Sequence, residues 1–229
     1  APQLYRITLN KKLNNAAEFT FNDGFTLTGL TNTADKAIEI VNGTLVLNDP
    51  SIDITLSSGG GNFLLPNSLN TEATSGSGGL AIQQGVARVS GANTGIILDG
   101  PLVISGGSLN MDGGVGVNNF IEYSASGNAS IELSAGTLTV GSQVRRSTAS
   151  TSGILKYTQT GGVAVFGKNA VPTTIRGVFE VINPGSEFHL DIDGGAGESF
   201  TVVRHLNSTS VPTVRLSPAT SSITDGSTI

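Results

Sequence analysis

The chain has 229 residues, of which 38% are hydrophobic and 13% charged, with a net charge of −5 at pH 7 and no Cys. The lack of Cys excludes disulfides and thiolate metal sites, and the acidic balance leaves no basic surface for a nucleic acid or an anionic bilayer. The longest aliphatic runs, such as Ile96–Leu98, are far shorter than the ~20 residues that cross a membrane, so we expect no membrane insertion of this segment.

Short alternating runs predict β-strands along the whole chain, because one face of each run is apolar and the other polar. In chain order these runs are Phe19–Phe21, Phe25–Leu27, Ile38–Ile40, Leu45–Leu47, Ile52–Ile54, Ile131–Leu133 and Phe188–Ile192. Clusters of Gly, Asn, Asp, Pro and Ser separate them and are typical of turns. No stretch keeps apolar residues at helical spacing over a dozen positions, so we predict an all-β chain.

A Gly-x-Leu-x-apolar unit recurs and favours one β architecture over the others. Clear copies lie at 43–47, 107–111 and 136–140, with degenerate copies at 162–166 and 185–190. Intervals of roughly 20 to 30 residues are typical of stacked coils, in which one coil buries little alone and neighbouring coils bury a common core. We therefore predict a parallel β-helix, or β-solenoid, as a single elongated domain. The alternative is a β-sandwich, or two sandwiches divided near Ser75–Gly79.

The two ends of the predicted domain differ in pattern. The run Leu4–Leu9 leads into Lys11 and Lys12, which fits a polar cap over an open end. We expect residues 1–35 to form this N-terminal cap or a first coil, and residues 36–229 to form the coils of the β-helix. Because the chain begins with Ala1 rather than Met, we also expect it to be a fragment of a longer protein.

Three segments resemble known repeats: residues 43–47, residues 101–111 and residues 136–166. The last segment begins GTLTVGSQVRR and ends GGVAVF. They resemble the repeat regions of bacterial autotransporter passengers and filamentous-haemagglutinin-like surface adhesins over most of 36–193. The resemblance implies a parallel β-helix that is secreted or exposed at the bacterial cell surface. It implies no particular receptor.

Stacked coils would form a stiff rod whose sides are rich in Thr, Ser and Asn, which favours a non-enzymatic adhesin or structural module with a distributed polar binding surface. The expected partners are an extracellular glycan, a host or neighbouring-cell surface, or further copies of the chain. A passive architectural spacer of a large surface protein is an alternative that needs no partner.

The densest acidic cluster supplies the candidates for catalysis and for metal binding. Glu187, Asp191 and Asp193 alternate with apolar residues and are the catalytic candidates for a polysaccharide lyase or glycoside hydrolase, which needs paired carboxylates. Asp191, Asp193 and Glu198 surround a glycine-rich turn and are the candidate calcium ligands. A solvated strand face and turn explain the same residues, and we expect no other cofactor.

Four further residues are candidates for ligand contact. Tyr123 and Tyr157 could stack on a saccharide if their rings are exposed, although half-buried strand tyrosines show the same pattern. Arg145 and Arg146 could contact an anionic partner, and the alternative is a solvated corner of the solenoid.

Overall fold

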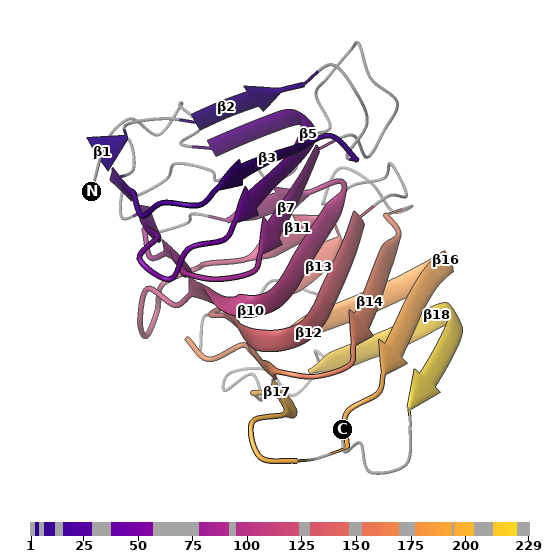
Figure 1. Cartoon of the computed structure of the whole chain (residues 1–229). Coiled ribbons are helices and arrows are strands. Elements are labelled where there is room, and N and C mark those ends of the chain that lie inside the picture. Colours follow the sequence, from indigo (N-terminus) through magenta and orange to yellow (C-terminus); the bar gives the residue numbers. More distant parts are fainter. Residues whose placement is uncertain are drawn as a thin grey trace.

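The structure is a computed structural model that describes residues 3–4, 7–11, 16–28, 38–56, 78–91, 95–123, 129–146, 153–169, 177–193, 195–203 and 213–223. All regular elements in these ranges are β-strands, and the chain winds through them in stacked coils (Figure 1). The strands of successive coils pair in parallel and form one continuous sheet that folds around the core. The prediction of an all-β parallel β-helix is therefore confirmed. The alternative prediction of a β-sandwich is wrong, because sandwiches are built from antiparallel sheets and the strand pairs described here are parallel.

Each complete coil passes through three faces, which we number in chain order. Face 1 consists of β2 (Ile7–Asn10), the first part of β5 (Ile38–Leu47), β9 (Ile96–Leu98), β11 (Ile121–Tyr123), β13 (Val144–Arg146) and the first parts of β16 (Phe179–Leu190) and β18 (Val214–Ile223).

Face 2 follows face 1, and in several coils one long strand bends through the corner between them. It consists of β3 (Glu18–Phe21), the second part of β5, β7 (Gly78–Ile82), the first parts of β10 (Pro101–Met111) and β12 (Ala129–Val140), β14 (Leu155–Gln159) and the second parts of β16 and β18.

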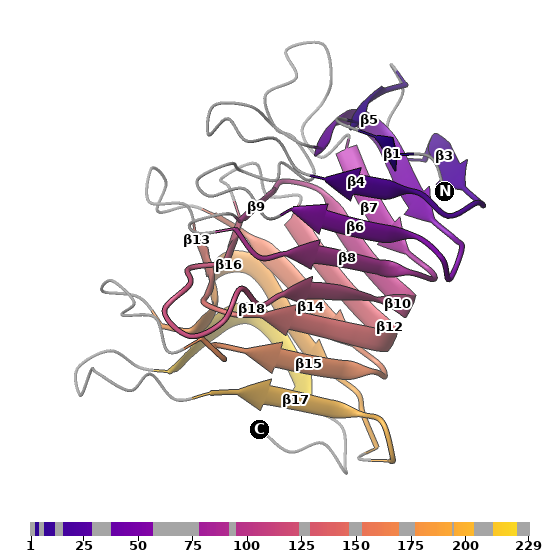
Figure 2. The same ribbon diagram turned by 90° about the vertical axis from the view of Figure 1, so that its left-hand side faces the viewer.

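Face 3 closes each coil and is the face turned to the viewer in Figure 2. It consists of β1 (Gln3–Leu4), β4 (Thr26–Thr28), β6 (Asp53–Leu56), β8 (Val86–Val89), the second parts of β10 and β12, β15 (Val163–Phe166) and β17 (Ser199–Val202).

One hydrophobic core fills the space between the three faces. Leu45, Leu109 and Leu138 are fully buried in the same cluster, which extends from Leu9 to Phe200. Inward side chains of successive coils lie in columns, as the pairing of Leu109 with Leu138 shows. Fully burying each such side chain contributes roughly 1.5 to 3 kcal/mol, so the stacking of coils is what stabilises the fold.

The glycine repeats belong to two different corners, which the sequence pattern does not distinguish. Gly136 and Gly162 (φ 80° and 69°) lie at the corner between faces 2 and 3, and the residues after them pair on face 3. Gly43 and Gly185 (φ 88° and 94°) lie at the corner between faces 1 and 2. The repeat series from 107 to 185 therefore changes corner at its last member. Glycines with positive φ occur at both corners, so the two corners share a similar local sequence, although Gly107 at the corner inside β10 is not among the positive-φ glycines.

The corners also differ in length. The corner from face 3 to face 1 spans residues 112–120 after β10 but only residues 141–143 after β12. The corner from face 2 to face 3 spans only 105–107 inside β10 and 134–136 inside β12. Among the described residues, the corner between faces 2 and 3 also varies in length, since β16 ends at Leu190 and β17 begins only at Ser199.

The described part of residues 1–35 adds strands to all three faces. β2 and β3 pair with β5, and β4 pairs with β6, so this segment stacks on the following coil. Leu9, Phe25 and Leu27 extend the common core. In the ranges that the structure describes, no helix is long and apolar enough to span a membrane.

Candidate functional site

The corner between β16 and β17 holds a small open cavity that we call the acidic corner. Thr160, Asp191, Ile192, Asp193 and Glu198 line this cavity of about 240 Å³. Thr160 comes from the corner one coil earlier, where β14 ends, and the Asp191 N–H donates to the Gln159 carbonyl oxygen at 2.8 Å. Because β16 ends at Leu190 and β17 begins at Ser199, this corner is longer than its counterparts in β10 and β12.

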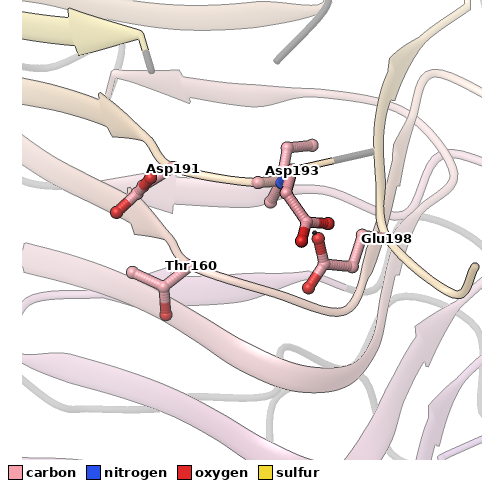
Figure 3. A pocket seen from close by; sticks show the side chains of 5 residues that line it. Thr160, Asp191, Asp193 and Glu198 are labelled. Atoms are coloured by element: carbon pink, nitrogen blue, oxygen red, sulfur yellow. Dashed lines mark hydrogen bonds between the residues drawn. The ribbon is translucent and has the colours of Figure 1, made fainter. Parts of the chain in front are cut away.

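Two carboxylates of the acidic corner face each other, as Figure 3 shows for Asp193 and Glu198. The Asp193 N–H donates to Glu198 Oε2 at 3.1 Å, and the Gly195 N–H donates to Asp193 Oδ1 at 2.8 Å. The Gly195 N–H, and secondarily hydrogen bonding with Glu198, lower the pKa of Asp193 below its usual value of 3.8. Asp193 therefore stays ionised at neutral pH and suits a base or nucleophile rather than a proton-donating acid.

The three catalytic candidates from the sequence do not converge. Phe188, Leu190 and Ile192 are buried as the alternation predicts, but Glu187 lies on face 2 and does not line the cavity. Its carboxylate contacts Lys156 Nζ at 2.8 Å and His189 Nε2 at 3.8 Å. Glu187 is thus part of a surface ion-pair group, which separates it from the two aspartates.

The three candidate calcium ligands lie in the same corner without enclosing one point. Asp191 lies apart from the facing pair of Asp193 and Glu198 (Figure 3). Over the described ranges, no group of three or more His, Cys, Asp or Glu side chains is placed to hold a metal ion. Calcium takes six to eight oxygen ligands, so these side chains alone would be only part of a calcium site.

The two candidate stacking tyrosines are core residues. Tyr123 and Tyr157 are fully buried, so neither ring offers a face to a saccharide. The Tyr123 hydroxyl donates to the Glu180 carbonyl oxygen, and the Tyr157 hydroxyl donates to Gln159 Oε1, both at 2.8 Å. Burial raises the pKa of Tyr157 well above 10.0. The condition for stacking, exposed rings, is therefore not met, and the rings are also more buried than half-buried strand tyrosines, because both occupy inward positions with internal acceptors for their hydroxyls.

The two candidate arginines are held in ion pairs along face 1. Arg145 Nε contacts Glu122 Oε2 at 2.9 Å, and its guanidinium lies 4.2 Å from the centre of the Phe120 ring. Arg146 Nε contacts Glu180 Oε1 at 3.0 Å. The side chains of Arg145 and Arg146 are only 16% and 13% exposed. They therefore do not lie in solvent at a corner, and neither is open to an anionic partner.

Glu122, Glu180 and Arg215 are the charged residues that sequence reasoning missed. Glu180 is fully buried, and Arg215 Nη1 lies 3.5 Å from Glu180 Oε1. The partners are 23, 34 and 35 positions apart in sequence. The available signal was the recurrence of a charge flanked by apolar residues in Ile121–Tyr123 and Phe179–Val181.

Polar side chains outside the core form stacks of their own. At the corner between faces 2 and 3, Asn48 Nδ2 donates to Asn22 Oδ1 at 3.3 Å, and Gln84 Nε2 donates to Asn48 Oδ1 at 3.1 Å. On face 3 the outward positions of β10, β12 and β17 carry small, at least partly exposed polar residues, whereas β15 between β12 and β17 carries Val163 and Val165. The polar residues include Ser108, Asn110, Thr137, Thr139, Ser199 and Thr201.

The chain matches no protein-family model, no curated protein and no solved structure. The likeness to autotransporter passengers and haemagglutinin-like repeats therefore stays a prediction. The fold and the geometry described above are the basis of the functional proposals that follow.

Proposed function

We propose that this chain is a non-enzymatic adhesive module, secreted or held at a bacterial cell surface, that binds an extracellular glycan or a cell surface. The observation that carries the proposal is the outward side of face 3. There, hydroxyl and amide side chains recur on β10, β12 and β17, with the valines of β15 between β12 and β17; neighbouring strands of a β-sheet lie ~4.8 Å apart. Such a surface presents many equivalent donors and acceptors and no single deep pocket.

The chemistry of face 3 favours many weak contacts over one strong contact. The ion pairs of face 1 are largely buried, and the exposed ion pair of face 3 between Asp53 and Arg88 lies on β6 and β8, outside the polar positions of β10, β12 and β17. Short Thr and Ser side chains lose little conformational freedom on binding. Contacts that are weak one by one reach useful strength when several engage together, provided that the partner repeats its own polar groups. A glycan does so.

Removing hydroxyls from one coil of face 3 tests the proposal. Thr137 and Thr139 pair with Val163 and Val165 of the next coil, so Thr137→Val with Thr139→Val copies a surface that the fold already accepts. We expect this double variant to keep its thermal stability and to lose retention on immobilised glycans or matrix proteins that the unchanged chain binds. The matched control is Thr158→Val, which removes an outward hydroxyl from face 2 and should leave retention unchanged.

Two results would count against an adhesive face 3. If the unchanged chain is retained by no glycan, matrix protein or cell surface in the panel, a passive architectural spacer is the better reading. If the double variant is retained as well as the unchanged chain, the binding surface lies elsewhere.

A polysaccharide-degrading enzyme is the second candidate, and the facing carboxylates of Asp193 and Glu198 are the observation that favours it. Glycoside hydrolases use two carboxylates on opposite sides of the scissile bond. Asp193→Asn with Glu198→Gln should abolish release of reducing or unsaturated ends from a polysaccharide if this corner is catalytic. Activity that survives the double change would exclude it.

A further inference from the structure

One apolar strand interrupts the polar surface of face 3. Val163 and Val165 of β15 point outward, since Ala164 between them and Phe166 after them are buried in the core. Both valine side chains remain partly exposed. The other outward positions from β10 to β17 carry hydroxyl or amide side chains. The two valines therefore form an apolar strip, one strand wide, which we call the valine strip.

Hydroxyl groups border the valine strip on both sides. The residues that pair in register with the two valines are Thr137 and Thr139 on β12, and Ser199 and Thr201 on β17. Neighbouring strands of a β-sheet lie ~4.8 Å apart, so one small chemical group can contact a valine and a bordering hydroxyl together. A ligand that lies across these strands thus meets polar, apolar and polar side chains in turn.

The surface around the valine strip is uncharged. All outward residues of face 3 on β10, β12, β15 and β17 are neutral, and the exposed ion pair of this face lies on β6 and β8. Glu198 of the acidic corner directly precedes Ser199, so a carboxylate adjoins one end of this surface. Because like charges repel, an anionic sugar is disfavoured and a neutral one fits better.

We propose that the valine strip determines the specificity of face 3 and selects a neutral glycan of N-acetylhexosamine units, an inference that rests on the adhesive function proposed above. An acetamido group carries a methyl group beside one hydrogen-bond donor and one acceptor. The methyl group would pack on Val163 or Val165, while the amide N–H and C=O meet the bordering hydroxyls. A sugar hydroxyl in place of the acetamido group would lose water over the valines without gaining a partner there.

A matched pair of tetrasaccharides tests this specificity. The probes are tetraacetylchitotetraose and cellotetraose, which differ only in the group on the second carbon of each sugar ring, acetamido in the first and hydroxyl in the second. Frontal affinity chromatography on the immobilised whole chain measures both affinities. We expect the acetamido probe to bind about fourfold more tightly for each methyl group that packs on a valine, since that is the gain from burying one such group.

Val163→Thr with Val165→Thr removes the valine strip. This double variant copies Thr137 and Thr139 of the neighbouring strand, so the fold already accepts the substituted surface. We expect it to lose the preference for the acetamido probe and to keep its affinity for cellotetraose. The matched control is Val103→Thr, which changes an outward, partly exposed valine on face 2 and should leave the preference intact. Circular dichroism verifies strand content, and Val165→Thr alone replaces the double variant if that unfolds.

Three results would overturn the assignment of the valine strip: equal affinity of the unchanged chain for the two tetrasaccharides, binding of neither, or a preference that the valine substitutions leave intact. Each differs from failure of the adhesive function. A chain that other glycans or cell surfaces retain, without distinguishing the two probes, is still adhesive but lacks this specificity. A chain that nothing in the panel retains loses both.

Discussion

Glu180→Gln is the most informative stability change, because Glu180 holds two arginines at once. The Glu180 side chain is 0% exposed and the Arg146 side chain 13%. Removing one partner from a buried pair costs about 3 to 5 kcal/mol. The more exposed Arg215 adds up to about 1 kcal/mol. Glu180 Oε2 has no hydrogen-bond partner, and the Gln amide is polar at the same position, so the change relieves no buried polar group.

The expected loss for Glu180→Gln is therefore about 3 to 6 kcal/mol of unfolding free energy. For a domain of this size that corresponds to about 6 to 24 °C in Tm, since 1 kcal/mol shifts Tm by about 2 to 4 °C. Differential scanning calorimetry and urea unfolding measure the two quantities. The control is Asp53→Asn, which breaks the ion pair between Asp53 and Arg88. Their side chains are 51% and 42% exposed, so this change should lower the unfolding free energy by less than about 1 kcal/mol. Equal losses for the two variants would refute the reasoning.

Three other variants test the core, the corners and the buried phenol. Leu138→Ala empties a fully buried position and should lower the unfolding free energy by about 2 to 5 kcal/mol in urea unfolding. Gly136→Ala should lower the unfolding free energy much more than Gly114→Ala in the same urea experiment. Both glycines have positive φ, which strains any Ala. A Cβ at 136 would also lie 2.1 Å from the Gly107 carbonyl oxygen, whereas a Cβ at 114 has no atom within 4 Å. The fold raises the pKa of Tyr157, so above pH 10.0 the phenol ionises in the unfolded chain before it does in the folded chain. The unfolding free energy should therefore fall as pH rises above 10.0, and Tyr157→Phe should reduce that fall in urea unfolding measured at several pH values. A Tyr157→Phe chain with an unchanged alkaline slope would contradict the assignment.

The sequence predicted the fold because the coils repeat one local rule. Alternation alone places Leu45, Leu109 and Leu138 inward, and their spacing indicates that they stack in one core. It does not say which corner a glycine serves, since Gly43 and Gly136 have similar φ and similar neighbours while lying at different corners. Register across coils is set by backbone pairing between distant residues, which no short motif encodes.

The candidate site was predicted less well, and for the same reason. The alternating pattern predicted that Asp191 and Asp193 point outward from a strand. However, β16 ends at Leu190, so both aspartates line a corner instead of extending face 2. The partners of Arg146 and Tyr157 depend on which strands become neighbours. Tyr157 also stacks on Phe188 of the next coil, at 5.6 Å between ring centres, a contact that only the register reveals.

The unequal corners between faces 3 and 1 have an evolutionary consequence. Lengthening a flexible connection costs little free energy, because the entropy of closing it grows only with the logarithm of its length. Each strand is held by hydrogen bonds to the strands of the coils before and after it, so a change of length at 112–120 or 141–143 need not alter the strands on either side. A chain with this scaffold can therefore gain or lose surface loops at its corners while its core stays unchanged.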